Sequence, residues 1–310
     1  MKRRAALLFL ATPALAQSRP LRIIVPFAPG GQSDTVMRLV APGMQEALGQ
    51  TIVVENRPGA GGAIGAGIVA AAPADGTTLL LDSFGFIVQP LIQRGLPFDY
   101  NTAFVAVSQL VALPYVLVVR GNFPARDLAG YLAAARAGAV NFGSPGVGSI
   151  GHLAGALLAH RAGVRLEHVP YRGGADAARD VAAGNLDSAI STANSLRPLT
   201  LDGRAHGIAL TSAERRGTMA NLPTIAESGF PGYDLTSWNG LFAPAGTPAA
   251  VVARIASAVD VSLADAQRRE RLAATGNDAV GGPPAAFAST VARDARVVRD
   301  LVRETALRVE

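Results

Sequence analysis

The feature that most constrains the fold is a buried strand, a glycine-rich turn and a helix near the N-terminus. Residues 21–27 form an apolar run rich in isoleucine and valine and interrupted by Arg22 alone, as expected of a strand covered on both faces. Ala28-Pro29-Gly30-Gly31 ends the run, and Ser33 or Asp34 is predicted to cap a helix that continues to about Leu48. Such alternation of strands and helices predicts an α/β fold with a largely parallel sheet.

The same pattern recurs along the chain. In the first third, strands are predicted at 51–55 and 77–82, and helices at 63–72 and 86–92. Pro42-Gly43 predicts a bend in the first helix, because proline lacks the N–H that a helix interior uses.

A β-rich stretch at 104–119 is interrupted by Pro114, which we interpret as a passage between two lobes. A second series follows, with strands at 139–143, 165–169, 186–192 and 206–211 and helices at 150–162 and 175–183. The last part has a strand at 238–243 and C-terminal helices, the first of them opened by Thr247-Pro248 as cap and first turn.

The first residues have the pattern of an export signal. Lys2, Arg3 and Arg4 precede an apolar run from Ala5 to Leu15, which is shorter than the roughly 20 residues that span a bilayer. Ala14-Leu15-Ala16 supplies the small residues of a cleavage site, so residues 1–16 are predicted to be a signal peptide and the mature protein to be periplasmic. Both the general and the twin-arginine export routes stay open.

Charge and cysteine content exclude several classes of function. Of the formal net charge of +5, three positive charges lie in the predicted signal peptide, so the mature chain is near +2. The remaining arginines are scattered among acids, so a nucleic-acid footprint is not predicted. The chain has no cysteine, which excludes disulfides and thiolate metal sites. A hydrophobic content of 49% suffices for two lobes, and no later segment has the pattern of a membrane span.

Two glycine-rich loops are the strongest candidate sites. Ligands of open parallel sheets bind beyond the carboxyl ends of the strands, where Gly30 and Gly31 would let backbone amides reach an anion; an ordinary strand–helix turn is the alternative. The second loop, residues 143–152, has glycines 146, 148 and 151 at G-x-G-x-x-G spacing, with Glu167 further on. It is either a dinucleotide-binding loop or a nest whose amides and Ser144 and Ser149 hydroxyls hold a carboxylate, and we favour the nest.

Other residues give weaker signals. Tyr171-Arg172-Gly173-Gly174 follows a predicted strand, and Arg172 would hold a carboxylate or lie exposed. Asp187 would polarise a water or a ligand amine, or stabilise a turn. No G-x-S-x-G nucleophile motif or metal-ligand spacing of histidines is present, so no catalytic residues, metal or cofactor are predicted.

Several motifs together resemble a known family. They comprise 24–31 (IVPFAPGG) with Asp34 and Arg38, 54–62 (VENRPGAGG), 74–79 (ADGTTL), 170–174 (PYRGG), 222–229 (LPTIAESG) and 238–248 (WNGLFAPAGTP). The chain thereby resembles the solute receptors of tripartite tricarboxylate transporters, the Bug family, over nearly the whole mature sequence.

The resemblance implies a two-lobed periplasmic-binding-protein fold of the Venus-flytrap, type II-like kind, each lobe a mixed, mostly parallel sheet flanked by helices. We expect one lobe at 17–113 plus 213–310 and the other at 114–212. The receptor would be a monomer that delivers a small carboxylate to a membrane permease or, in some members, informs a sensor kinase. The alternative is a secreted nucleotide-dependent oxidoreductase or hydrolase that uses the Gly146–Gly151 loop.

The resemblance also implies how the ligand is held, through backbone amides and bridging waters. The residues carried over are Phe27, Ala28, Pro29, Gly30, Gly31 and Asp34 in the first lobe, Ser144, Gly148, Ser149, Tyr171, Arg172, Gly173, Gly174 and Ala175 in the second, and Asp82, Ser83 and Phe84 lining the cleft between them. Asp82 and Phe84 depart from the small or hydroxylated residues expected there. Asp82 would repel an anion or recognise an amine.

Overall fold

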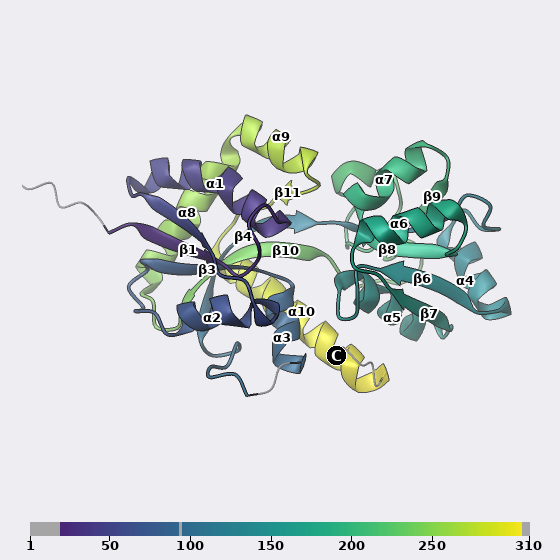
Figure 1. Ribbon diagram of the computed structural model, residues 1–310, viewed down its shortest axis with the longest axis horizontal. Coiled ribbons are helices and arrows are strands. Elements are labelled where there is room, and N and C mark those ends of the chain that lie inside the picture. Colours follow the sequence, from purple (N-terminus) through teal and green to yellow (C-terminus); the bar gives the residue numbers. More distant parts are fainter. Residues whose placement is uncertain (1–18, 93–94, 306–310) are drawn as a thin grey trace, which may run out of the picture.

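A computed structural model describes residues 19–92 and 95–305, so the predicted signal peptide lies outside the described residues. The chain forms two lobes placed end to end, and each lobe is built on one sheet (Figure 1). The predicted two-lobed α/β fold is confirmed. Of the described helices, none combines the length and apolar character needed to cross a membrane.

The first sheet has six strands in the order β11-β4-β10-β3-β1-β2. Three of them, β1 (Leu21–Val25), β2 (Ile52–Asn56) and β3 (Thr78–Ser83), are parallel. Strand β10 (Ser237–Pro244) lies antiparallel between β3 and β4 (Phe104–Leu113), so a late segment of the chain completes the sheet that the first hundred residues begin. The short β11 (Asp278–Ala279) was not predicted.

The second sheet has five strands in the order β7-β6-β8-β5-β9. Its parallel strands are β6 (Val140–Ser144), β7 (Leu166–Pro170) and β8 (Ser188–Thr192). Strand β5 (Tyr115–Arg120) is antiparallel to both β8 and β9 (Ala205–Leu210). Pro114 separates β4 from β5, as predicted for the passage between the lobes.

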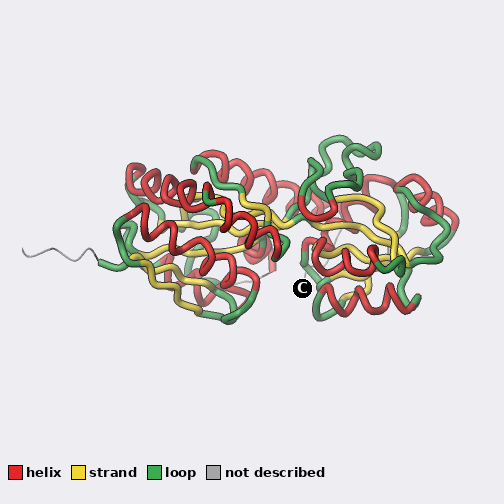
Figure 2. Tube along the Cα trace, turned by 90° about the horizontal axis from the view of Figure 1, so that it is seen from above, coloured by secondary structure: helices red, strands yellow, loops and turns green. Residues whose placement is uncertain are grey.

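Helices cover both faces of each sheet, as Figure 2 shows. In the first lobe, α1 (Gln32–Leu48), α8 (Ala249–Ala264) and α9 (Ala266–Ala274) pack together on one face, and α2 (Ala63–Ala70), α3 (Gly85–Ile92) and α10 (Pro284–Thr305) lie on the other. In the second, α4 (Leu128–Ala137) and α5 (Ile150–Ala162) oppose α6 (Gly174–Ala183) and α7 (Ala193–Leu201). Two 3₁₀ turns, η1 (Ala60–Gly62) and η2 (Gly217–Met219), complete the structure.

The parallel strands of each lobe run toward the other lobe. Strand β10 enters the first lobe from the second, and β3 is antiparallel to it, so β1, β2 and β3 all run toward the second lobe. Strand β5 leaves the first lobe, and β8 is antiparallel to it, so β6, β7 and β8 run toward the first lobe. The carboxyl ends of both parallel sets therefore face the gap between the lobes (Figure 1).

The predicted caps of two helices are wrong. Neither Ser33 nor Asp34 caps α1, because the helix begins at Gln32, before both of them, and Gly31 is its N-cap, with no side-chain hydrogen bond. Pro248, rather than Thr247, occupies the N-cap of α8. The Thr247 hydroxyl instead donates 2.8 Å to the carbonyl of Pro244, which closes the turn after β10.

Helix α1 continues through Pro42 as one helix, and the predicted bend there stays a prediction. Partners from other helices hold this region, because Ser262 Oγ donates 2.7 Å to the Val40 carbonyl and Arg268 Nε donates 2.9 Å to the Leu39 carbonyl. A Cβ on Gly43 would lie 2.6 Å from Arg268 Nη1. The atypical Pro42-Gly43 pair thus lets the first turn of α9 approach α1 closely.

Two chain crossings join the lobes, and Thr211 is hydrogen-bonded to both of them. The Thr211 hydroxyl donates 2.6 Å to the carbonyl of Leu235, and the Thr211 N–H donates 3.0 Å to the carbonyl of Tyr115. The predicted lobe boundaries after 113 and 212 stay a prediction. Beyond residue 212, Tyr233 still contacts the second lobe, where its hydroxyl donates 2.7 Å to the Ala154 carbonyl of α5.

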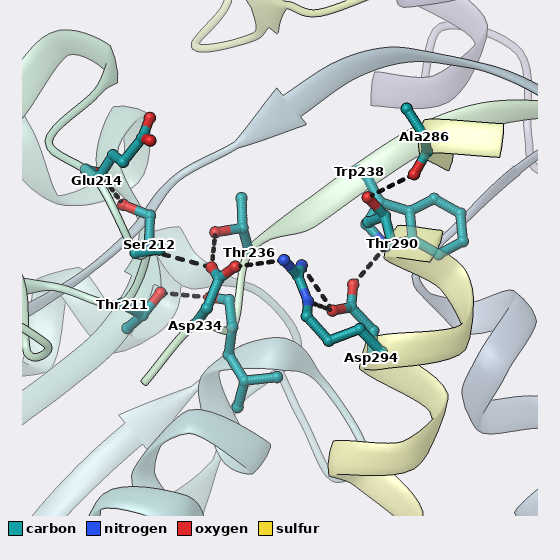
Figure 3. Close-up of polar contacts among 12 residues, drawn as sticks. Thr211, Ser212, Glu214, Asp234, Thr236, Trp238, Ala286, Thr290 and Asp294 are labelled. Carbon is teal, nitrogen blue, oxygen red and sulfur yellow. Dashed lines mark hydrogen bonds and ion pairs between the residues drawn. The ribbon is translucent and has the colours of Figure 1, made fainter. Parts of the chain in front are cut away.

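The second crossing is also tied to α10. Asp234 accepts from Arg293 at 2.8 Å, and Arg293 contacts Asp294 at 2.8 Å. Figure 3 shows Asp294 in turn holding the indole of Trp238, whose Nε1 donates 3.0 Å. Burial raises the pKa of Asp294 to about 6, against the lowering effect of Arg293 and Trp238. This network anchors the start of β10 to the helix beside it.

Candidate ligand-binding site

The topology places the candidate loops at two switch points. In the first sheet, β1 lies between β2 and β3, so the chain moves to one side of β1 to form β2 and returns to its other side to form β3. In the second sheet, β6 lies between β7 and β8 in the same way. Ligands of open α/β sheets bind in the crevice that such a reversal opens beyond the carboxyl ends. Residues 26–31 follow β1 and Phe84 follows β3. In the second lobe, residues 145–149 follow β6, and residues 193–195, the first turn of α7, follow β8.

Asp34 holds the first loop from beneath. Its buried carboxylate accepts from the Gly30 N–H at 2.8 Å, from Asn56 Nδ2 at 2.9 Å and from Arg38 Nε at 3.0 Å. Burial raises the pKa of Asp34, but these three donors lower it by more, so the pKa lies below its ordinary value. These three contacts hold the loop in place through the Asp34 carboxylate. Ala28, Pro29 and Gly30 are exposed, and Phe27 and Gly31 are half-buried.

The end of β3 divides into buried and accessible parts. Asp82 is 2% exposed, and its carboxylate accepts 2.7 Å from the N–H of Ser83. Burial raises the pKa of Asp82 to about 7. Phe84 is also buried and packs at 6.2 Å, centroid to centroid, from Trp238. Of this trio only Ser83 is half-buried. Asp82 and Phe84 were expected to line a cleft, and their side chains are buried within the first lobe.

Neutral groups hold the second loop. Ser144 is fully buried, and its hydroxyl lies 2.7 Å from His168 Nε2 and 3.2 Å from Ser149 Oγ. Ser149 donates 2.7 Å to the Gly146 carbonyl and caps α5 by accepting from the His152 N–H. Both hydroxyls are thereby used within the loop.

Two stacked histidines support the same loop. The rings of His152 and His168 are 4.0 Å apart, and His152 Nδ1 accepts 3.1 Å from the Gly148 N–H. Burial lowers the pKa of His152, and burial together with the neighbouring His152 lowers the pKa of His168 to about 4. Both imidazoles are therefore neutral at neutral pH, and the second loop contains no fixed charge.

The third loop, residues 171–175, lies beside the second. The Tyr171 N–H donates 3.0 Å to the Ser144 carbonyl, and the Tyr171 hydroxyl donates 2.6 Å to Asp180. Arg172 and Ala175 are exposed, and Gly173 and Gly174 are half-buried. The structure thus brings residues 144–149 and 171–175 together at one end of the second sheet.

Asp187 does not belong to this group. It precedes β8, at the end of the strand opposite to the candidate loops. Its carboxylate accepts 3.2 Å from Arg120 Nε and 3.2 Å from the Asn141 N–H. These contacts fit the alternative of a turn-stabilising aspartate.

Comparison with known protein families and relatives establishes the family of this chain. Residues 36–307 match the model of the tripartite tricarboxylate transporter family receptor. The chain belongs to this receptor family. It is 41% identical over 274 residues, 87% of this chain and 82% of the relative, to the UPF0065 protein in the tcbD-tcbE intergenic region of Pseudomonas sp. strain P51. It is 30% identical to protein BugT of Bordetella pertussis over 98% of this chain and 97% of that one.

Solved structures of the family share the fold. The receptor superposes on a TctC solute-binding protein from Polaromonas with a TM-score of 0.85 and 28% identity, over 93% of this chain and 99% of that one. An R. palustris protein with adipate has 32% identity and a TM-score of 0.72, covering 92% and 97%. MatC from Rhodopseudomonas palustris, with bound malate, has 30% identity and a TM-score of 0.69, covering 92% and 99%. The protein is a periplasmic solute-binding receptor of the Bug family.

The sequence analysis missed polar residues that the receptor places beside these loops. After β8, Ser191 is buried and its hydroxyl has no partner among the described residues. A Cβ on Gly174 would lie 2.1 Å from that hydroxyl, so the start of α6 packs directly on Ser191. The run Ser191-Thr192-Ala193-Asn194-Ser195 at the end of a buried strand was the available signal.

In the first lobe, Gln32 and Asn239 were also missed. Gln32 Nε2 donates 2.7 Å to the side-chain oxygens of both Asn239 and Asn277, and Asn239 Nδ2 donates 2.9 Å to Ser33 Oγ. Asn239 lies on β10 and Asn277 before β11, more than 200 positions after Gln32. This long separation in sequence left no local pattern to detect.

The dinucleotide alternative lacks its acidic partner. Glu167 pairs in register with Asn141 at the start of β6, whereas the glycine loop follows Ser144 at the end. Three residues of strand separate them, about 10 Å. Glu167 pairs instead with Arg165 at 2.9 Å, so no carboxylate from β7 reaches the loop to bind a ribose. Among the described residues, no cluster of three or more His, Asp or Glu side chains is arranged to hold a metal ion.

Proposed function

We propose that this receptor binds a small organic carboxylate between its lobes, through backbone N–H groups and bridging waters, and delivers it to a tripartite tricarboxylate-type permease. The observation that carries the proposal is a pair of uncapped helices. Gly31 is the N-cap residue of α1 and Gly173 that of α6, and no side chain caps either helix. Both follow strands whose carboxyl ends face the opposite lobe.

An uncapped helix start suits a carboxylate on two grounds. Its first N–H groups have no acceptor within the helix, and the aligned peptide dipoles place a partial positive charge there. Helix α5, between them, is capped by Ser149 and is therefore less available. The anion is thus assigned to α1 and α6, with the α5 loop as a wall.

The energetics are sufficient without a cluster of arginines. Hydrogen bonds to a charged group contribute about 1.5–3 kcal/mol each, so four or five give roughly 6–15 kcal/mol before the costs of association. Micromolar affinity corresponds to about 8 kcal/mol. The bound state would require the lobes to close, because donors from both must reach one ligand.

The predicted site residues then divide by role. The contacting groups are assigned to the accessible backbone of Phe27, Ala28 and Pro29, to Ser83 and to Arg172, Gly173, Gly174 and Ala175. The N–H groups of Gly30, Gly31 and Gly148 already donate to Asp34, Ala28 and His152, so these glycines are assigned to shaping the loops. The positioning residues are Asp34, Asp82, Phe84, Ser144, Ser149 and Tyr171, because their side chains are bonded or buried within their own lobes. Asp187 is left out of the proposed site because it lies at the other end of β8.

The two ligand-bound relatives support the ligand class, since adipate and malate are both dicarboxylates. We extend this class to the present receptor. It would act as an exported monomer, cleaved near Ala16, and the membrane permease would be its partner. Size-exclusion chromatography of the mature protein tests the monomer assignment.

A charge-insertion pair tests the site. Ala175 and Ala250 are both exposed alanines in the first turn of an uncapped helix, α6 and α8 respectively. Glutamate at either position is compatible with the helix. Ala175→Glu should lower the affinity for the best ligand of a mono- and dicarboxylate panel at least tenfold by calorimetry, because it repels an anion at α6. Ala250→Glu should leave that affinity unchanged.

Two results would contradict the proposal. One is equal affinity for the Ala175→Glu and wild-type receptors. The other is a panel in which no carboxylate raises the melting temperature, whereas a nucleotide does so. The second result would favour the enzyme alternative.

A further inference from the structure

The first lobe contains a second cavity that shares no residue with the proposed carboxylate site. It has a volume of about 680 Å³ and lies between α3, α10 and the strands β4 and β10. Small-molecule sites in proteins typically have about 300–1,000 Å³. The cavity therefore has room for a ligand of some size. Figure 1 shows α3 and α10 side by side below the first sheet.

Aromatic rings form the inner wall of this cavity. Phe86 stacks on Phe242 with ring centroids 4.1 Å apart, and Tyr100 and Phe104 contact Phe86 edge-on at 5.1 and 5.5 Å. Rings packed in this way form a rigid apolar surface. Their mutual contacts fix the shape of the cavity before any ligand arrives.

Small side chains on α10 keep the opposite wall open. Ala288, Ala292 and Ala295 line the cavity at spacings of four and three residues, along one face of the helix. Larger apolar residues at these positions would fill the space between α3 and α10. The alanines therefore maintain the cavity rather than close it.

The polar groups of the cavity are cationic or neutral. Arg296 and Arg299 line it and are exposed, and neither forms an ion pair with another described residue. No described lining residue is acidic. Deeper in, Tyr100 is 3% exposed, and its hydroxyl has no hydrogen-bond partner among the described residues. Such a hydroxyl needs a partner from a ligand or a water.

We propose that this cavity is a second binding site, for an amphipathic anion whose apolar body lies against the aromatic wall and whose carboxylate or sulfonate group pairs with Arg296 and Arg299. The chemistry differs from that of the site between the lobes. There, backbone amides would hold a small polar anion, whereas here burial of apolar surface supplies the affinity and the arginines select the charge.

Two fluorescent probes test the site, because they share a naphthylamine body and differ in charge. Anilinonaphthalene sulfonate is an anion, and phenylnaphthylamine is neutral. Both should bind the folded wild-type receptor saturably. Ala292→Phe should weaken both probes at least tenfold by filling the cavity. Because Ala292 is exposed, this change leaves the core intact, which an unchanged melting temperature would verify.

Charge selection is tested separately with Arg299→Gln and the double variant that adds Arg296→Gln. These should weaken the sulfonate probe at least fivefold and the neutral probe less than twofold. The controls are Ala286→Phe, an exposed alanine of α10 outside the cavity, and Arg271→Gln, an exposed arginine of α9. Neither control should change the affinity for either probe.

Full-strength binding of both probes to Ala292→Phe would overturn the assignment of the site. Equal loss of the two probes in the arginine variants, or no loss of either, would overturn the assignment of an anion. Ala175→Glu distinguishes this proposal from the proposed carboxylate function, because it should reduce carboxylate binding and leave both probes unaffected.

Discussion

The first and second loops are both rich in glycine but are stabilised by different kinds of side chain. In the first, the buried Asp34 carboxylate gathers the Gly30 N–H, Asn56 and Arg38. In the second, the Ser144 hydroxyl and the stacked rings of His152 and His168 do the corresponding work without charge. Both loops end with accessible glycine backbone at the same kind of strand terminus.

This difference shows that a glycine-rich loop at a strand end can be held in place either by charged or by neutral side chains. An ionic support keeps its strength until its acid is protonated, and the pKa of Asp34 lies below the ordinary value of 3.8. A histidine support weakens at much milder acidity, because an imidazole with a lowered pKa resists the proton that the unfolded chain accepts. The two loops should therefore lose stability at different pH values.

The largest effect is expected from removing the ionic support. Asp34→Ala leaves three donors without their acceptor, which should destabilise the receptor by about 2–3 kcal/mol, since Arg38 is half exposed and recovers solvent. Ligand affinity should fall at least tenfold, because the Gly30 loop loses its anchor. Urea unfolding and calorimetry measure the two effects.

Asp176→Asn is the matched control for Asp34→Ala. It alters the first-turn acid of α6, whose described partner is the exposed Arg179, and it should cost no more than about 0.5 kcal/mol. Unchanged affinity in Asp34→Ala would show that the first loop keeps its shape without the carboxylate.

The next effect concerns pH and the second loop. The pKa of His168 is lowered from 6.5 to about 4 in the folded receptor, so between these values the unfolded chain takes up a proton that the folded one refuses. Its contribution is complete above pH 6.5 and is lost as the pH falls toward 4, by about 1–2 kcal/mol given its partial exposure. His168→Gln should remove this loss.

Thermal unfolding at a series of pH values between 4 and 7 measures the His168 effect. Because Asp34 titrates below this window, Asp34→Ala should keep the wild-type slope. If His168→Gln and wild type were to lose stability in parallel, the histidine support would not be the pH-sensitive element.

The smallest effect has the opposite sign. Burial raises the pKa of Asp82 from 3.8 to about 7, so the wild type loses stability as the pH rises between these values. Asp82→Asn keeps an acceptor for the Ser83 N–H without the charge, and it should stabilise the receptor at pH 8 by about 1 kcal/mol and a few degrees of melting temperature. No gain should appear at pH 4.

The same variant sharpens the comparison with Asp34, because it shows that a buried carboxylate stabilises a loop only where cations or several donors surround it. Ligand affinity of Asp82→Asn should stay within twofold of wild type. A large change in affinity would instead restore Asp82 to the contacting residues.

Much of the architecture was predictable from local patterns. The apolar run from residue 21, the glycines at 30 and 31 and the break at Pro114 predicted β1, the start of α1 and the passage between the sheets within a few residues. Helix α4 was missed although its signal is local. Asp127 caps it, and Leu128, Tyr131 and Leu132 form its buried face.

Other features could not be predicted from local sequence patterns. Strand β10 enters the first sheet more than 120 residues after β4, and nothing in the sequence of either strand specifies the other as its neighbour. The contact of Gln32 with Asn239 and Asn277 depends on that pairing. The roles of Asp34 and Ser144 as supports also required coordinates, because a sequence shows that a polar residue is near a loop but not the direction of its side chain.

The paired crossings at Thr211 bear on how the halves of this molecule can move. Two neighbouring chain connections that share hydrogen bonds to Thr211 should resist twisting and sliding of the lobes. They should still allow the lobes to bend about a line that crosses both connections. We therefore expect the lobes to close by bending about this line, which would bring the same backbone amides of the two lobes to face each other. The geometry that a ligand meets between the lobes would then be set by the backbone of these two connections.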